Sequence, residues 1–180
     1  MWVIKMKKLL IVVDYQNDFV DGTLGFPGSE KLDQRIADRI KEYKNNGDLV
    51  IFTFDTHFDS YLETVEGKHL PVPHCIKGTN GHKLYGKTGE MFDEKNDIYF
   101  EKNTFPSLDL ANYLVNQEFE SVELCGLVSN ICVISNVVMV KAALPNVEIY
   151  VDKNLTSSFD ESMNDACFKV LEGIHVNVKG

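Results

Sequence analysis

Short runs of apolar residues recur along the chain, and their pattern predicts the fold. They cover residues 9–13, 49–54, 98–101, 122–124, 147–151 and 175–178. The first two runs are continuous rather than alternating, which is typical of parallel strands that are buried on both faces. The last run is short and more polar, so we interpret it as an edge strand.

Segments with helical spacing lie between these runs. In residues 29–47, apolar side chains recur three or four positions apart, and Ser29 is expected to cap this helix. Further helices are predicted over residues 108–115 and 131–144. Ser158 to Glu161 match a capping box. The helix behind it is expected to end at Gly173 and to bury Met163, Ala166, Cys167, Val170 and Leu171.

The alternation of strands and helices predicts an α/β fold. We expect a mostly parallel central sheet of about six strands with helices on both faces, which is a three-layer sandwich. The 180 residues suit a single domain, 1–180, with one full core. Met6 would serve equally well as a start, so residues 1–5 could be an N-terminal extension.

Composition narrows the function classes. A net charge of −9 argues against a nucleic-acid binder or a protein held on anionic lipid. No apolar run is long enough to span a membrane. The first apolar run ends in Asp14 without a small-residue cleavage site, so it predicts a core strand rather than a signal peptide. We therefore expect a cytoplasmic protein whose four cysteines are reduced thiols.

Three reactive residue types follow three different predicted strands. Asp14 follows the first strand, Lys102 follows residues 98–101, and Cys132 begins the helix after residues 122–124. The carboxyl ends of parallel strands meet at one edge of the sheet, where open α/β folds carry their ligand sites. A helix N-terminus lowers the pKa of a cysteine there. Taken singly, each residue also has an ordinary explanation: a loop cap, a solvated charge and a buried small side chain.

Residues 56–90 form a long predicted loop region with candidate metal ligands. Asp55, His57 and His74 offer the nitrogen and oxygen donors that suit zinc, iron or manganese, and Glu66 is a further candidate ligand. Histidines beside carboxylates are also often only hydrogen-bonded, so the motif alone leaves both interpretations open. Three other histidines have no such context and are interpreted as bystanders, namely His69, His82 and His175.

Three motifs resemble those of the isochorismatase-like cysteine hydrolases. They are residues 12–19, VVDYQNDF, residues 100–103, FEKN, and residues 126–133, GLVSNICV. The resemblance implies a catalytic triad of Asp14, Lys102 and Cys132. It also implies a cis peptide bond between Val128 and Ser129, and an oxyanion hole formed by the Val128 and Cys132 N–H groups.

Within that family, two segments are similar to the metal site of nicotinamidases. They carry Asp55, His57 and His74, and the resemblance adds Glu66 as the fourth ligand of a divalent metal ion, zinc first, with iron or manganese as alternatives. It also implies a substrate pocket with Phe19, Val128 and Ser129. Many nicotinamidases have an aromatic residue just before the Pro-x-His segment, whereas residues 70–72 here are Leu-Pro-Val. We therefore expect a weaker ring-stacking wall and looser ring selectivity.

These observations predict a cysteine amidohydrolase that converts nicotinamide to nicotinate and ammonia through a thioester, which would place it in NAD salvage. The alternatives are another small amide or carbamoyl substrate, isochorismate, or a non-catalytic binding protein. The cysteine favours an amide, because ether-cleaving members of the family typically have another residue there. Apart from a small-molecule amide, we expect no nucleic-acid or membrane partner, and assembly into a homo-oligomer.

Overall fold

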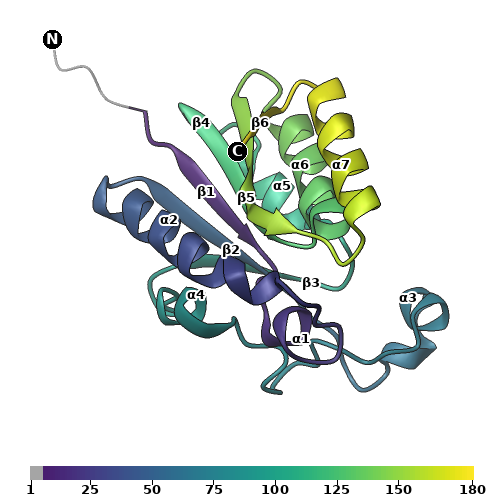
Figure 1. Cartoon of the computed structure of the whole chain (residues 1–180). Helices are drawn as coiled ribbons and strands as arrows, with labels where there is room; N and C mark the ends of the chain where they lie inside the picture. Colours follow the sequence, from purple (N-terminus) through teal and green to yellow (C-terminus); the bar gives the residue numbers. More distant parts are fainter. Residues whose placement is uncertain (1–5) are drawn as a thin grey trace, which may run out of the picture.

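The computed structural model describes residues 6–180, so the suggested extension at residues 1–5 lies outside the described residues. Figure 1 shows a twisted sheet with helices packed on both faces, which confirms the predicted three-layer architecture. The sheet has six strands in the order β3-β2-β1-β4-β5-β6, and all neighbouring strands run parallel. Their bounds are β1 Leu9–Val13, β2 Leu49–Asp55, β3 Ile98–Lys102, β4 Ser121–Leu127, β5 Glu148–Ser157 and β6 Asn177–Lys179.

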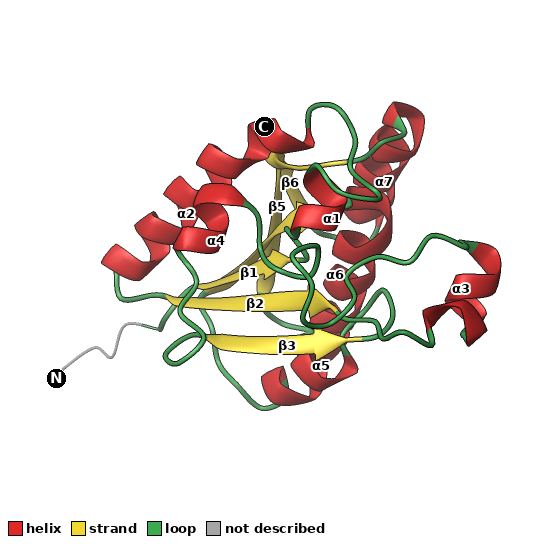
Figure 2. Cartoon of the chain, turned by 90° about the horizontal axis from the view of Figure 1, so that it is seen from below, coloured by secondary structure: helices red, strands yellow, loops and turns green. Residues whose placement is uncertain are grey.

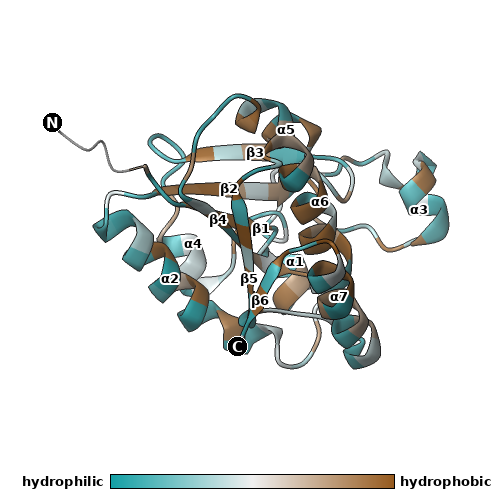
Figure 3. Cartoon of the chain, turned by 90° about the horizontal axis from the view of Figure 1, so that it is seen from above, coloured by the Kyte–Doolittle hydropathy of each residue, from teal (hydrophilic) through white to brown (hydrophobic). Residues whose placement is uncertain are grey.

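Alternate side chains of β1 build the two halves of the core. Leu9, Ile11 and Val13 pack toward the layer formed by α5 (Leu108–Leu114), α6 (Ile134–Ala143) and α7 (Glu161–Gly173). Leu10 and Val12 pack toward α2 (Asp33–Asn45) on the opposite face. Because β1 is buried on both faces, its sequence is continuously apolar. Figure 3 shows the same arrangement, with hydrophobic segments in the sheet and along α6 and a polar outer face on α2.

Two helix starts differ from the sequence predictions. Ser29 does not cap α2. It opens a 3-10 turn, Ser29–Leu32, and its buried hydroxyl donates to the carbonyl of Phe26 at 2.6 Å. Asp160, rather than Ser158, caps α7, because its carboxylate accepts the Met163 N–H at 3.0 Å. Both predicted capping hydroxyls bond elsewhere, Ser29 with the Phe26 carbonyl and Ser158 with the Asp160 N–H at 3.1 Å.

The apolar face of α7 is narrower than predicted. Cys167 and Leu171 are buried together with Phe168, but Met163 and Val170 are about half exposed and Ala166 is exposed as well. β5 is longer than predicted, because a bulge opposite β4 lets the strand continue to Ser157. β6 lies at one edge of the sheet, as predicted. Among residues 6–180, no helix is both long and apolar enough to cross a membrane.

The long connection between β2 and β3 contains only short helical pieces. These are a 3-10 turn, Tyr61–Glu63, and the helices α3 (Val65–His69) and α4 (Gly86–Glu90). A shorter connection after β1 carries α1 (Asn17–Val20). Figure 2 shows that α3 projects away from the body of the protein, beyond the ends of β2 and β3 where the strand arrows point. The connection thus places its side chains at the carboxyl edge of the sheet, where ligands bind in open α/β folds.

Candidate active site

Asp14 occupies the first position after β1 and is held by the neighbouring strand. Its backbone N–H donates to the carbonyl of Thr53 at 3.2 Å, and its Oδ1 accepts the Thr53 hydroxyl at 2.7 Å. The residue has φ = 46° and is completely buried. Aspartate tolerates this left-handed conformation better than most residues. The chain therefore turns sharply at Asp14 and presents its carboxylate to the ends of the other strands.

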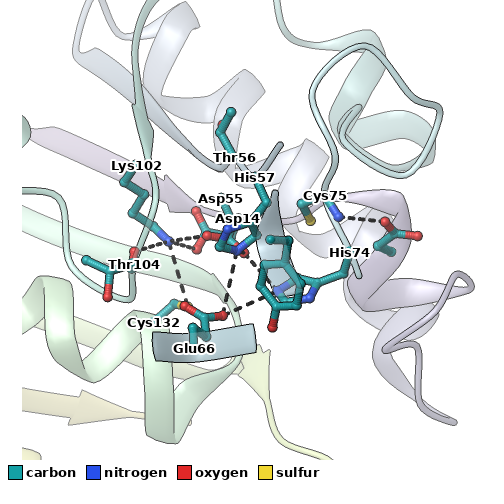
Figure 4. A network of polar contacts seen from close by, with 12 residues as sticks. Asp14, Asp55, Thr56, His57, Glu66, His74, Cys75, Lys102, Thr104 and Cys132 are labelled. Carbon is teal, nitrogen blue, oxygen red and sulfur yellow. Dashed lines mark hydrogen bonds and ion pairs between the residues drawn. The ribbon is translucent and has the colours of Figure 1, made fainter. Parts of the chain in front are cut away.

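Lys102 and Cys132 meet Asp14 at this edge. The Lys102 ammonium lies 2.5 Å from Asp14 Oδ2 and 3.9 Å from the Cys132 sulfur, and it donates to the carbonyl of Thr104 at 3.0 Å. Figure 4 shows these groups converging from separate segments. The structure thus brings together the three residues that the sequence analysis selected as a triad.

Cys132 lies at the start of the α6 layer, as expected, but in a π-helical turn, Ser129–Val133, rather than in a regular first α-helical turn. Asn136 anchors this turn, because its amide donates to the Cys132 carbonyl at 2.8 Å and its Oδ1 accepts the Ser107 N–H at 3.0 Å. Asn136 is fully buried. The turn places the thiol beside Lys102 and near the N-terminal end of α6, where backbone N–H groups favour negative charge.

Burial and the neighbouring charges together set the protonation of these groups. Burial raises the pKa of the Cys132 thiol, contrary to the lowered pKa expected from its place at a helix N-terminus; Lys102 opposes this rise, and the nearby carboxylates, including a hydrogen-bonded Asp14, reinforce it. Burial also raises the pKa of Asp14, while Lys102 opposes the shift. Burial alone would lower the pKa of Lys102, but the charges of Asp14 and Cys132 outweigh it and raise the pKa. Lys102 therefore remains a cation, and Asp14 can hold a proton.

The backbone before Cys132 differs from the prediction at one bond. The cis peptide joins Leu127 and Val128, not Val128 and Ser129. It lies where β4 ends, because Leu127 still pairs with Ser157 of β5 and the turn begins at Val128. Val128 then precedes the π-helical turn and accepts the Val133 N–H at 3.1 Å through its carbonyl.

Four candidate metal ligands converge beside the triad. Asp55, His57, Glu66 and His74 each offer a ligand atom, and these atoms lie within 4.8 Å of one another. Asp55 Oδ2 lies 3.1 Å from His57 Nε2 and 3.2 Å from His74 Nε2, and Glu66 Oε1 lies 3.6 Å from both nitrogens. The Lys102 ammonium is 3.5 Å from Asp55 Oδ1, so the cluster and the triad share one charge network.

The donor set fits a divalent transition metal. Two imidazoles and two carboxylates are ligands that such ions accept. His74 Nδ1 hydrogen-bonds to the carbonyl of Val72 at 2.8 Å, which leaves Nε2 directed at the cluster. A second hydrogen bond of this kind typically orients a metal-binding histidine. Of the histidines interpreted as bystanders, His82 contacts the site indirectly, because its Nε2 lies 2.8 Å from the Thr56 hydroxyl.

A cavity of about 380 Å³ opens onto both the thiol and the cluster. Phe19 and Val128 line it, as expected from the resemblance. Ser129 is not among its lining residues, because its side chain turns toward α7 and its hydroxyl donates to Asn164 Oδ1 at 2.5 Å. The remaining lining residues are Leu24, Gly25, Phe26, Asp55, Glu66, Leu70, His74, Phe105, Ile131, Cys132 and Phe159.

Three phenylalanines in that lining were not identified from the sequence. Phe26, Phe105 and Phe159 come from three separate loops, and the rings of Phe26 and Phe159 lie 6.2 Å apart. No local pattern marks them. Phe159 lies between β5 and α7, inside the segment that matched a capping box. They supply aromatic surface to a cavity for which the sequence predicted a weak wall.

This chain is similar to known proteins in both sequence and structure. The sequence model of the isochorismatase domain matches residues 8–178. An isochorismatase family protein called PncA from Bacillus subtilis is 36% identical over 167 residues, covering 87% of this chain and 89% of that protein. A crystal structure of nicotinamidase/pyrazinamidase PncA from Bacillus subtilis superposes with a TM-score of 0.84 at 29% identity, covering 97% of this chain and all of that one.

A third similar structure is the pyrazinamidase of Pyrococcus horikoshii in complex with zinc. Its TM-score is 0.81 at 21% identity, and the match covers 96% of this chain and 98% of that one. At this identity the likeness concerns the fold. The match to the domain model over nearly the whole chain, together with the Bacillus relative, shows that this protein belongs to the isochorismatase family.

Proposed function

We propose that this protein is a cysteine amidohydrolase whose preferred substrate is nicotinamide or a similar flat heteroaromatic amide. As a member of the nicotinamidase-like branch, it is a hydrolase of amide C–N bonds, and relatives named nicotinamidase support the choice of substrate. One structural observation carries the proposal: a single cavity is lined both by Cys132 and by three of the candidate metal ligands, Asp55, Glu66 and His74. Its size suits a small ring compound.

In the acylation step, Asp14 accepts the proton of the Cys132 thiol, and the sulfur attacks the carbonyl carbon of the amide. Lys102, 3.9 Å from the sulfur, stabilises the thiolate through its charge. The N–H groups of Val128 and Cys132 are the proposed donors to the oxyanion. Asp14 then gives its proton to the departing nitrogen, so that ammonia leaves and a thioester remains.

In the deacylation step, water attacks the thioester carbonyl while Asp14 accepts one of its protons. The carbon–sulfur bond breaks, the carboxylic acid leaves, and the proton returns to the Cys132 sulfur. Each turnover thus consumes one water and releases one acid and one ammonia. The buried, cation-paired carboxylate suits this exchange because burial raises the pKa of Asp14.

We further propose that Asp55, His57, Glu66 and His74 hold a divalent metal ion, zinc being the first candidate. When bound, such an ion would supply a coordination position for the ring nitrogen of the substrate. Phe19 lies next to these ligands in the cavity, because the centroid of its ring is 5.6 Å from that of the His74 ring. Holding the ring fixes the distance of the amide carbon from Cys132, and such positioning can contribute several kcal/mol to lowering the barrier.

The decisive experiment compares ammonia release from nicotinamide and from benzamide, which keeps the ring and the amide but lacks the ring nitrogen. The protein is purified without chelator, and its zinc, iron and manganese contents are measured. We expect near-stoichiometric metal and much faster cleavage of nicotinamide. His57→Ala and treatment with chelator should both reduce the difference between the two substrates.

Equal rates on the two aromatic amides would contradict the role proposed for the ring nitrogen. Turnover of an aliphatic or carbamoyl compound without turnover of nicotinamide would replace the proposed substrate. Substantial amide hydrolysis by Cys132→Ala would contradict the nucleophile assignment itself.

A further inference from the structure

The turn after β1 carries three polar residues that the proposed mechanism does not use. These are Gln16, Asn17 and Asp18 of the first motif. Their backbone lies along residues 80–84, since Gln16 bridges to Leu84, the Asn17 N–H donates to the Lys83 carbonyl at 2.9 Å, and the Asp18 N–H donates to the Gly81 carbonyl at 3.1 Å. The turn is thereby held in place beside the segments that carry the candidate metal ligands.

The side-chain amide of Gln16 hydrogen-bonds to the backbone of Asp55. Its Oε1 accepts the Asp55 N–H at 2.8 Å, and its Nε2 donates to the Asp55 carbonyl at 2.9 Å and to the His82 carbonyl at 2.8 Å. Gln16 is completely buried, and both hydrogens of its amide are used. A residue proposed as a metal ligand is thus held through both of its backbone polar groups by one side chain.

Asp18 hydrogen-bonds to the backbone of Cys75, the residue that follows the candidate ligand His74. Its Oδ2 accepts the Cys75 N–H at 2.7 Å, and Cys75 has φ = 46° directly after His74. The Cys75 carbonyl in turn accepts the His57 N–H at 3.0 Å. One carboxylate therefore anchors the residue that joins the backbones of both candidate histidine ligands.

Two glycines show that the space around this carboxylate is filled. A Cβ atom added at Gly22 or at Gly81 would overlap with the carboxylate oxygens of Asp18. The Asp18 Oδ1 also accepts the Thr23 N–H at 3.3 Å. Asp18 is thus enclosed by backbone from two loops, and its orientation toward Cys75 is fixed by packing as well as by hydrogen bonds.

From these contacts we infer that Gln16 and Asp18 are positioning residues that hold Asp55, His57 and His74 in a metal-binding arrangement before any ion arrives. The inference rests on the metal site of the proposed function, but it concerns residues that are not ligands. Groups that orient ligands from outside typically change metal affinity 10- to 100-fold when removed. Preorganisation of this kind reduces the ordering cost that binding would otherwise carry.

The test measures the zinc dissociation constant of metal-stripped protein by competition with a chromophoric chelator. We expect Asp18→Ala and Gln16→Glu each to weaken zinc binding about 10- to 100-fold. Gln16→Glu keeps the size of the side chain and loses both donors, so it provides a second variant if Asp18→Ala does not fold. Asp18→Asn keeps an acceptor for the Cys75 N–H and should recover most of the affinity.

Asn17→Ala is the matched control. Asn17 belongs to the same turn and donates to the Asn80 carbonyl at 2.7 Å, but its side chain reaches none of the ligand-bearing residues. It should bind zinc as the wild type does. Thermal unfolding of the metal-free variants shows whether a change in affinity is only a loss of fold.

The outcomes separate this inference from the proposed function. If the wild type binds no metal near stoichiometry, the proposed metal site is wrong and the positioning role is wrong with it. If the wild type binds zinc and Gln16→Glu binds it equally well, the positioning role alone is overturned. A variant with a lower melting temperature but an unchanged zinc affinity would assign these residues to stability only, and would also overturn it.

Discussion

Lys102 Nζ lies 2.5 Å from Asp14 Oδ2, and the two side chains are 3% and 0% exposed. This ion pair is therefore removed from water, unlike the Lys77–Glu101 pair of the same sheet edge, whose side chains are 50% and 32% exposed. Breaking a buried pair by removing one partner leaves an uncompensated charge, whereas an exposed pair contributes little. Removing either partner should therefore change the stability of the protein as well as its catalytic chemistry.

Lys102→Met should lower the free energy of unfolding by about 3 kcal/mol, because it leaves the Asp14 carboxylate buried without its cation. Adding Asp14→Asn to that variant should restore part of the loss, because the unpaired charge is then removed. Urea unfolding of metal-free protein measures Lys102→Met, Asp14→Asn and the double variant. Lys77→Met is the control and should leave the unfolding free energy nearly unchanged. Strictly additive effects of the two active-site substitutions would show that the pair is not coupled.

Cys132 should be the cysteine that iodoacetamide modifies first. Cys132 lines the cavity and is 6% exposed. Cys75 and Cys125 are fully buried and do not line the cavity. Cys167 is also buried, and its thiol donates to the Ser129 carbonyl at 3.2 Å. Peptide mass spectrometry after brief labelling identifies the site. Preferential labelling of another cysteine, or equally fast labelling of Cys132→Ala, would be evidence against the assignment.

The effect of the Lys102 charge on the Cys132 thiol should be measurable in the pH dependence of iodoacetamide labelling. Lys102 opposes the rise that burial causes in the pKa of the Cys132 thiol, so Lys102→Met should raise this pKa further. Because only the thiolate reacts, the labelling rate at a given pH should fall, and the midpoint of the rate–pH curve should move to higher pH. Lys77→Met again serves as the control. An unchanged midpoint would mean that Lys102 does not stabilise the thiolate.

Much of the fold follows from the sequence because each strand has a local signal. The continuous apolar run of β1 and the polar residue after it predicted both the buried strand and the position of Asp14. The same reasoning placed Lys102 and Cys132 at one edge, since the carboxyl ends of parallel strands share it. Asp55 and His57 were likewise found from their position at the end of β2 and just beyond it. These predictions depend on residues near each other in the chain.

Features that depend on contacts between distant segments were not predicted correctly. Nothing in residues 129–133 distinguishes a π-helical turn from the first turn of a regular helix, and the cis bond was expected one residue too late. Ser158 matched a cap, but Asp160 has the better geometry in the folded chain. The side chain of Ser129 turns toward Asn164, which is far away in sequence. Tertiary contacts decide such details, and no local motif records them.

The phenylalanines of the cavity show this most clearly and lead to the last prediction. Phe159 is 64% exposed although it is large and apolar, and it lies at the cavity beside Phe26. An aromatic contact of this kind contributes about 1 kcal/mol, so Phe159→Ala should raise the KM for nicotinamide about fivefold. The kcat should change little, because this wall would bind the ring equally in the ground state and in the transition state.

Phe58→Ala is the matched control for this wall. Phe58 is 57% exposed and does not line this cavity, so its removal should leave both constants unchanged. Phe159→Trp should keep a low KM, because a larger ring still covers the substrate. Steady-state kinetics on nicotinamide and on an aliphatic amide test the argument, since the effect of Phe159→Ala should disappear with the aliphatic compound. If Phe159→Ala instead lowers kcat for both substrates to the same degree, Phe159 acts on the arrangement of the catalytic residues and is not a ring-binding wall.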